Sequence, residues 1–168
     1  MKENITTYKI YENSIRLNQI IVSEINENVF KKRFNLSGDI IDSNTFEVYN
    51  CVSFIVFKPN LGPLIRLKVN LENANNNGTE SIIKLERING FSYYVQYWFS
   101  LIFTIVTLII SLYYLITTGI DNIQSLLLPT FSFIYFSSIK LIASSSTKSL
   151  ISRIENIIKI EKIKFNKL

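Results

Sequence analysis

The chain has 168 residues, a formal net charge of +5 and 48% hydrophobic residues. It contains no histidine and one cysteine, Cys51, so it can form neither an internal disulfide nor a histidine-based metal site. It also lacks a Gly-rich phosphate loop, a paired-carboxylate motif and metal-ligand spacing. The composition therefore excludes the enzyme classes that need these groups. We expect no metal and no cofactor, and a lone cysteine suits a reducing, cytoplasmic setting.

The positive charge is concentrated near the C-terminus. Residues 1–90 hold 11 basic and 10 acidic residues, residues 91–139 hold only Asp121, and residues 140–168 hold seven basic residues against Glu155 and Glu161. A basic excess directly after an apolar run follows the positive-inside rule, and it also attracts anionic headgroups. The charge therefore predicts membrane lipid as a partner and no nucleic acid.

The N-terminal residues predict a strand followed by a helix. They include no apolar run typical of a cleaved signal peptide. Thr7–Tyr11 alternates polar and apolar residues, as a short strand does. Ser14 is the expected N-cap of a helix that ends near Asn28 and whose apolar residues share one face; these are Leu17, Ile20, Ile21, Ile25 and Val29. Because β-branched residues are frequent here, a strand at residues 19–22 is the alternative.

From Lys32 onward the period changes to two. Residues 32–40, 45–50 and 52–57 predict three strands of a meander, and the two prolines of residues 58–63 predict a turn. Residues 64–72 and 79–88 predict a hairpin across an Asn-rich turn. The expected fold class is α+β. A small antiparallel sheet with an N-terminal helix (residues 1–90) precedes a transmembrane helical hairpin (91–143) and a basic amphipathic tail helix (144–168).

Two runs, SGDIIDSNTFEVYN (37–50) and SFIVFKPNLGPLIRLKVNLE (53–72), precede the apolar pair. Together they resemble a family of uncharacterised bacterial membrane proteins that have a small β-rich N-terminal module and two spans. The resemblance covers residues 37–142 and implies no known activity, and Lys58-Pro59 lies later than the proline of that pattern. The chain is also similar to helix-grip lipid-binding modules of the START type. That likeness implies that the segment after Ser149 is the gripped helix and that the apolar hairpin is an insertion.

The stretch from Phe91 to Ala143 predicts two membrane spans, at about 92–117 and 123–143. No formal charge occurs between Arg87 and Asp121, which leaves enough apolar chain for a helix to cross a hydrocarbon core of ~30 Å. Pro129 is expected to kink the second span. The charge-free runs argue against a pump, a transporter or a charged pore, because ionisable groups usually line such pathways.

Side chains of the first span predict its boundaries and its packing face. Aromatic residues near both ends predict interfacial anchors; these are Tyr93, Tyr94, Tyr97, Trp98, Tyr113 and Tyr114. Hydroxyl residues at spacings of four, three and four predict a face that packs on the second span, with a homo-oligomer interface as the alternative; these are Ser100, Thr104, Thr107 and Ser111. The loop at 117–124 lacks basic residues, whereas both outer flanks carry them. We therefore expect a two-span protein of the cell (inner) membrane with both termini cytoplasmic.

The C-terminal segment begins with a Ser/Thr-rich link at residues 144–149 and continues as an amphipathic helix capped by Ser149. We expect this helix to pack against the sheet, and the alternative is that it lies on the membrane surface. Six basic residues are candidates for contacts with anionic headgroups or with a protein partner; these are Lys31, Lys32, Arg33, Lys159, Lys162 and Lys164. The alternative is that they only form a solvent-exposed charged surface.

No residue is a convincing catalytic group. Cys51 has no histidine to activate it, and Asp39 and Asp42 have the positions of turn-forming carboxylates. We therefore expect a non-enzymatic membrane protein whose cytoplasmic module binds a protein or lipid partner. One alternative is a module that encloses a lipid or another hydrophobic ligand. The other is a small membrane enzyme that uses Cys51, Asp39 or the basic cluster at residues 31–33.

Overall fold

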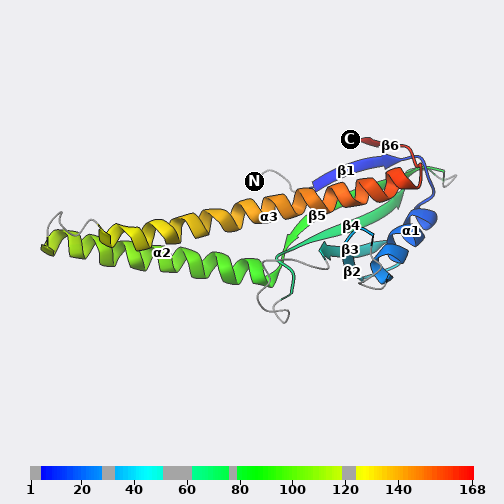
Figure 1. The fold of residues 1–168 in the computed structure, drawn as a ribbon. Helices are drawn as coiled ribbons and strands as arrows, with labels where there is room; N and C mark the ends of the chain where they lie inside the picture. Colours follow the sequence, from blue (N-terminus) through cyan, green and yellow to red (C-terminus); the bar gives the residue numbers. More distant parts are fainter. Residues whose placement is uncertain (1–4, 28–32, 51–61, 76–78, 119–123) are drawn as a thin grey trace.

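The computed structural model describes residues 5–27, 33–50, 62–75, 79–118 and 124–168. Its elements are β1 (Ile5–Ile10), α1 (Ser14–Asn26), β2 (Leu36–Ile40), β3 (Thr45–Asn50), β4 (Ile65–Asn73), β5 (Ser81–Asn89), α2 (Phe91–Thr118), α3 (Leu127–Ile160) and β6 (Phe165–Lys167). Figure 1 shows a six-stranded sheet at one end and a long helical hairpin that extends away from it. The predicted α+β class is confirmed. The predicted strand at 52–57 lies outside the described residues.

The strand order in the sheet is β2-β3-β4-β5-β1-β6, and every neighbouring pair is antiparallel. The β2–β3 and β4–β5 pairs agree with the prediction. The second neighbour of β3 is β4, not the strand predicted at 52–57. The last strand, β6, was not predicted from the sequence. It pairs with β1, so the first and last described strands lie side by side (Figure 1).

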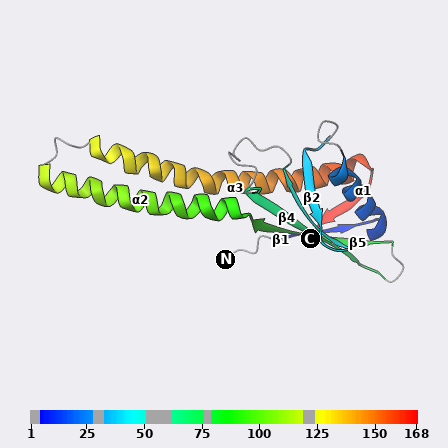
Figure 2. The same ribbon diagram turned by 90° about the horizontal axis from the view of Figure 1, so that it is seen from below.

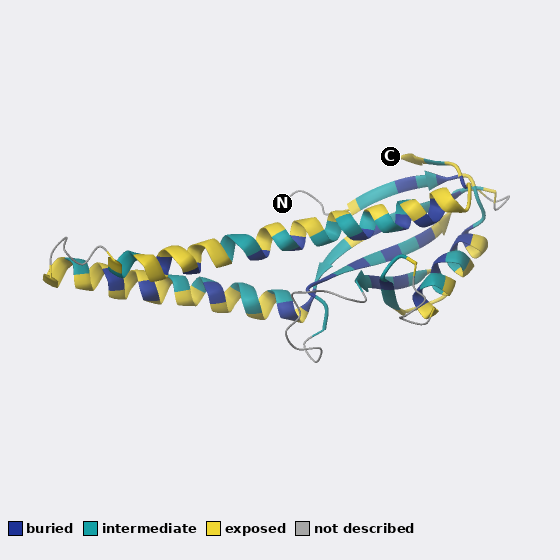
Figure 3. Cartoon of the chain, in the orientation of Figure 1, coloured by how far each residue is buried: buried dark blue, intermediate teal, exposed yellow. Residues whose placement is uncertain are grey.

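The core lies between one face of the sheet and two helices. In β4, Ile65, Leu67, Val69 and Leu71 are buried and alternate with half-buried polar residues, which is the period-two pattern of a sheet with one covered face. Helices α1 and α3 lie over that face (Figures 2 and 3). Twelve large side chains there are less than 2% exposed, and each such aliphatic side chain contributes ~1.5–3 kcal/mol on burial.

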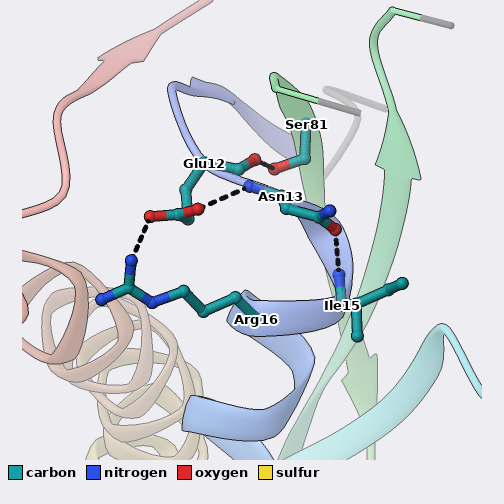
Figure 4. Close-up of polar contacts among 5 residues, drawn as sticks. All are labelled: Glu12, Asn13, Ile15, Arg16 and Ser81. Carbon is teal, nitrogen blue, oxygen red and sulfur yellow. Dashed lines mark hydrogen bonds and ion pairs between the residues drawn. The ribbon is translucent and has the colours of Figure 1, made fainter. Parts of the chain in front are cut away.

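The N-terminus of α1 is capped by Asn13, and the prediction of Ser14 as the cap was wrong. The side chain of Asn13 accepts a hydrogen bond from the Ile15 N–H at 2.8 Å (Figure 4), which satisfies one of the free donors of the first turn. Ser14 is instead the first helical residue and is buried. Ser81 Oγ donates to the Glu12 carbonyl at 2.9 Å and ties the cap to β5.

Helix α3 is one unbroken helix of 34 residues, ~51 Å long at 1.5 Å per residue. Residues 144–149, predicted as a Ser/Thr-rich link, are helical. The helix therefore continues across the boundary that we predicted between the hairpin and the tail helix. Hydroxyl groups in this helix donate back to its own carbonyls; Thr147 Oγ1, for example, lies 2.9 Å from the Ala143 carbonyl oxygen. Leu150, Ile154 and Ile158 are buried against the sheet, so the tail helix packs on the sheet as predicted.

The C-terminal end of α3 turns the chain back toward β1. Lys162 has a φ of 58°, and the Ile163 N–H donates to the Ile158 carbonyl at 3.1 Å. This left-handed residue with a bond that spans five residues is a Schellman motif, which usually has glycine at the left-handed position. Ile158 and Ile163 are both buried in the core, as the motif's apolar contact requires. The motif directs Phe165 onto the edge of the sheet.

Candidate functional site

The hairpin of α2 and α3 exposes an apolar surface. Both helices are long and apolar enough to cross a membrane, and only 17% and 22% of their most apolar windows is buried inside the protein. That exposure distinguishes them from the core helices of a soluble domain, which bury their apolar face. The exposed side chains cover both helices; they include Phe99, Ile102, Ile109, Ile116, Phe131, Phe133, Ile134 and Leu141.

The hydroxyl residues of α2 face α3. Ser100, Thr107 and Ser111 are 2–4% exposed, and Thr104 is half-buried. Ser111 Oγ donates across the hairpin to the Ser125 carbonyl at 2.6 Å, whereas Thr107 Oγ1 donates to the Phe103 carbonyl of its own helix at 2.8 Å. Small hydroxyl residues allow two helices to approach closely in lipid. This face is therefore occupied by α3 within one chain.

Pro129 lies in the first turn of α3, and the predicted kink in the second span was wrong. The α-helix begins at Leu127, and the first four N–H groups of a helix have no partner within it. A proline at this position costs no hydrogen bond, and its fixed φ suits the start of a helix. The expectation failed because the described residues 124–126, predicted as part of the span, precede the α-helix.

The aromatic residues lie at the two ends of α2. Trp98 is 56% exposed at the sheet end, and Tyr113 is 65% exposed at the loop end. Tyr94 and Tyr114 are 20 residues apart, which corresponds to ~30 Å along a helix and to the thickness of a hydrocarbon core. Tyr93 and Tyr97 are half-buried and stack at 5.8 Å between ring centroids. The spacing fits anchors at two membrane surfaces.

A cation–aromatic cluster lies at the sheet end of the hairpin. Lys140 Nζ is 4.6 Å from the Phe136 ring centroid and 5.5 Å from that of Tyr97, and these two rings are 5.1 Å apart. Arg87 lies over Tyr93 at 5.8 Å. Such pairs contribute ~0.5–2 kcal/mol, more where water is excluded. The cluster joins α2 to α3 where the charge-free runs end.

The turn from β5 into α2 is held rigidly by its backbone. The Gly90 N–H donates to the Leu64 carbonyl at 2.9 Å, and the Tyr93 N–H donates to the Gly90 carbonyl at 3.0 Å. Ser92 Oγ donates to the Gly62 carbonyl at 2.8 Å, and Ser92 is 2% exposed. The hairpin is thus attached to the sheet twice, by this turn and by α3, with no flexible linker at either attachment.

A cavity of about 410 Å³ lies between the helices at the loop end of the hairpin. Its lining is mainly apolar and includes Ile110, Leu128 and Phe131 beside Ser125. Ser125 Oγ is buried and lacks a hydrogen-bond partner within the described chain. Its volume lies near the lower end of the ~300–1,000 Å³ that sites for drug-sized ligands span.

The basic candidates fall into separate groups. Lys31 and Lys32 lie outside the described residues, and Arg33 lies 5.6 Å from the Phe34 ring centroid. The other three, Lys159, Lys162 and Lys164, lie in the last turn of α3 or directly after it. Figure 1 shows that this end of α3 is the one farthest from the hairpin. Lys159 follows Lys140 by 19 residues in the same helix, a distance of ~28 Å. The structure therefore does not bring these lysines to the base of the hairpin.

The candidate catalytic groups form no site in the described part of the chain. Asp39 is 61% exposed at its side chain and lies 3.8 Å from Arg66, which also binds Glu47 at 2.8 Å. Asp42 accepts a hydrogen bond from the Asn44 N–H, and this bond lowers the pKa of Asp42, as in an Asx turn. Cys51 lies outside the described residues. Among the described residues no cluster of three acidic, cysteine or histidine residues is placed to hold a metal ion.

Sequence reasoning missed a half-buried arginine on α3. Arg153 Nη1 donates to the Asn50 side-chain oxygen at 2.7 Å and to the Asn35 carbonyl at 2.8 Å. Burial lowers the pKa of Arg153, and no carboxylate lies within 4 Å of it among the described residues. Its two acceptors lie at the paired ends of β2 and β3. Arg153 therefore fastens α3 to the edge of the sheet.

Replacement of this arginine is expected to loosen that edge. Arg153→Met keeps the stem and removes the donors, so it leaves half-buried acceptors unsatisfied at a cost of ~1–3 kcal/mol. Arg16→Met is the matched control, because Arg16 forms an exposed pair with Glu12 of the kind that contributes ~0–1 kcal/mol. Denaturant unfolding in detergent micelles measures both, and equal losses would contradict the role given to Arg153.

A second interaction below α3 joins Tyr8 to Glu155. Tyr8 is 2% exposed and donates to the Glu155 carboxylate at 2.5 Å. Burial and this hydrogen bond raise the pKa of Tyr8 well above its ordinary value. The phenol stays protonated in the folded state, so its stabilising effect is complete below the unfolded pKa of ~10 and is lost as pH rises through the folded pKa.

The free energy of unfolding should therefore fall above pH ~10, by up to ~1.4 kcal/mol per pH unit from this group. Tyr8→Phe should remove that part of the slope. Glu155→Gln should only reduce it, because burial, the larger cause, remains. Unfolding measured between pH 8 and 11 tests this, and parallel curves for the wild type and Tyr8→Phe would refute it.

The described residues thus assemble an apolar two-helix hairpin that is held by two attachments to a helix-covered sheet. The outer face of the sheet carries paired charges, such as Lys84 with Glu72 at 2.7 Å. The molecule thus consists of a sheet domain connected to a pair of long apolar helices. Comparison of the chain with protein families, with curated proteins and with solved structures found no match, so neither resemblance drawn from the sequence gains support from them.

Proposed function

We propose that the chain is a two-span protein of the cell membrane whose sheet module serves on the cytoplasmic side as a membrane-anchored interaction module. The observation that carries this proposal is the continuity of α3. One half of this helix belongs to the apolar hairpin, and the other half packs on the sheet through Leu150, Ile154 and Ile158. A partner bound to the sheet would therefore be held at a fixed height and orientation relative to the bilayer.

The length of α3 supports the arrangement. About 20 residues cross a hydrocarbon core, which leaves ~14 of the 34 residues, or ~21 Å, for contact with the sheet. Lys140 and Lys148 follow the apolar half, and Arg87 precedes α2. The basic residues therefore gather on the sheet side, as expected for the cytoplasmic side.

The packing of the core favours an interaction module over a hydrophobic-ligand carrier. Phe46, Leu67 and Ile154, which belong to the core between the sheet and its helices, are 0–1% exposed. Neither of the two cavities whose lining is described lies between them. A carrier needs an internal space of several hundred Å³ at that position. An enzyme gains no support from the two candidate carboxylates that the structure describes, because Asp39 lies beside Arg66 and Asp42 forms a turn.

Single-cysteine labelling tests the topology. In a Cys51→Ser background, Thr118→Cys should react with a membrane-impermeant maleimide added to intact cells, whereas Lys167→Cys should react only after permeabilisation. Reporter fusions after Thr118 and at the C-terminus provide an independent readout. Labelling of Lys167→Cys in intact cells would overturn the orientation, and extraction of the protein by carbonate would overturn membrane insertion.

A further inference from the structure

The residues after α3 form a basic edge of the sheet. We define the basic edge as β6 together with Lys159, Lys162, Lys164 and Lys167. Residues 159–168 contain these four lysines and one acidic side chain, Glu161. Within the described chain none of the four lysines has a carboxylate within 4 Å. The basic edge lies far from the C-terminal end of α2, as Figures 1 and 2 show.

The backbone of β6 has one paired side and one open side. Tyr11 N–H donates to the Lys164 carbonyl at 3.0 Å, and Leu168 N–H donates to the Thr7 carbonyl at 2.9 Å. In an antiparallel ladder alternate residues bond to the same neighbour, so the N–H and C=O groups of Phe165 and Lys167 face away from β1. No described strand pairs with that side. Such an edge is a template for a further strand.

Side chains on both faces of this edge are arranged around the open backbone. On one face, Asn166 Nδ2 donates to the Tyr11 hydroxyl at 3.3 Å, beside a cavity of about 680 Å³ that Lys164 and Ile163 also line. On the other face, the Phe165 ring lies 5.8 Å from that of Tyr8 and 5.9 Å from Lys159 Nζ. A strand added here would meet lysine on each face, with an apolar surface between.

We propose that the basic edge binds an extended acidic peptide segment of a partner protein, which adds to β6 as a seventh strand. Backbone hydrogen bonds to Phe165 and Lys167 would provide affinity, and alternating acidic side chains would pair with the lysines. Charge complementarity selects this occupant. A headgroup surface is disfavoured because Lys159 lies ~28 Å along α3 from Lys140, where the charge-free run ends. The inference rests on the proposed function only for the cytoplasmic location of the edge.

Proline substitution separates strand addition from simple charge attraction. Lys167→Gln removes one charge and keeps the outward N–H. Lys167→Pro removes both, yet it spares the pairing with β1, because the N–H of Lys167 is not used there and proline is tolerated at such edge positions. Titration of a fluorescent peptide of alternating Glu and Val against the full chain in detergent micelles measures binding, and the same peptide with Gln for Glu is the control.

Lys164→Gln/Lys167→Gln should weaken binding of the acidic peptide about tenfold, since each exposed pair contributes up to ~1 kcal/mol. Lys167→Pro should bind about fivefold more weakly than Lys167→Gln, because a backbone hydrogen bond contributes ~0.5–1.5 kcal/mol. Equal affinities for these two variants would overturn strand addition. Equal affinity for the Glu and Gln peptides would overturn charge recognition, as would stronger capture of separate anionic vesicles than of the peptide. Since the titration uses micelles, its failure is distinguishable from a failure of the proposed topology.

Discussion

Gly90→Ala should lower the stability of the whole molecule by about 3 kcal/mol, because overpacking against rigid backbone costs ~1–3 kcal/mol or more. A Cβ at this position would lie 1.9 Å from the Pro63 carbonyl oxygen and 3.2 Å from that of Leu64. Both atoms belong to the backbone directly before β4, so neither can move without a shift of the chain that leads into the strand. The shift would also break the 2.9 Å bond from the Gly90 N–H to Leu64.

Thermal unfolding in detergent measures the effect, and 3 kcal/mol corresponds to a fall of ~6–12 °C in the midpoint for a chain of this size. Gly62→Ala is the control. Its Cβ would meet only the far end of the Arg66 side chain at 3.7 Å, although the φ of Gly62 is +73°, so we expect a loss of ~1–2 kcal/mol from backbone strain alone. A midpoint for Gly90→Ala within 2 °C of the wild type would contradict the close approach.

Ile154→Ala should cost ~2–5 kcal/mol, the range for removal of a large aliphatic side chain from a core. Ile154 is 1% exposed and lies on the half of α3 that covers the sheet. The sheet module should loosen while the hairpin stays helical, because membrane helices keep their hydrogen bonds in lipid independently of the sheet. Limited proteolysis of the protein in membranes, followed by mass spectrometry, should therefore show faster cleavage in residues 5–89.

Ile160→Ala is the matched control for this experiment. It removes the same atoms from the same helix, but Ile160 is 42% exposed, so we expect a change within ~0.5 kcal/mol. If both variants were cleaved equally fast, the contact between α3 and the sheet would not be the main attachment of the module. If neither variant were cleaved faster than the wild type, β6 and Arg153 would be sufficient to hold α3 on the sheet without the apolar contact of Ile154.

Two attachments connect the hairpin to the sheet. The turn at Gly90 and the unbroken α3 leave no hinge between the hairpin and the sheet among the described residues. The sheet and the hairpin are therefore joined at two places by hydrogen-bonded structure. Lys159 of the basic edge lies ~28 Å along α3 from Lys140 at the base of the hairpin.

The amino-acid pattern alone was sufficient for the hairpin and most of the sheet. Hydropathy and length are local properties, so the apolar run that became α2 was visible without knowledge of its neighbours. The alternation in Leu64–Glu72 likewise predicted β4, since one of its faces is buried and the other polar. The α1 boundary was correct to within about two residues, and only the cap was misassigned.

Other features depended on partners distant in the sequence. Tyr8 and Glu155 are separated by 147 positions, and Arg153 and Asn50 by 103, so no local pattern links them. The basic segment after Glu161 mixes two periods, and its strand forms only because β1 offers an open edge. The charge of these lysines was visible in the sequence. Their distance from the hairpin was not, because it follows from the unbroken length of α3.

The sequence by itself determined that this chain has an apolar hairpin, a covered antiparallel sheet and a basic C-terminal segment, because each of these follows from composition and period. Only the tertiary structure decided that residues 144–149 continue one helix from the hairpin onto the sheet. Serine and threonine favour helix or turn according to whether their hydroxyls bond to the preceding turn and whether the next residues find a surface to cover. Here the sheet provides that surface, and residues 144–149, predicted as a link, form part of the helix that connects the hairpin to the sheet.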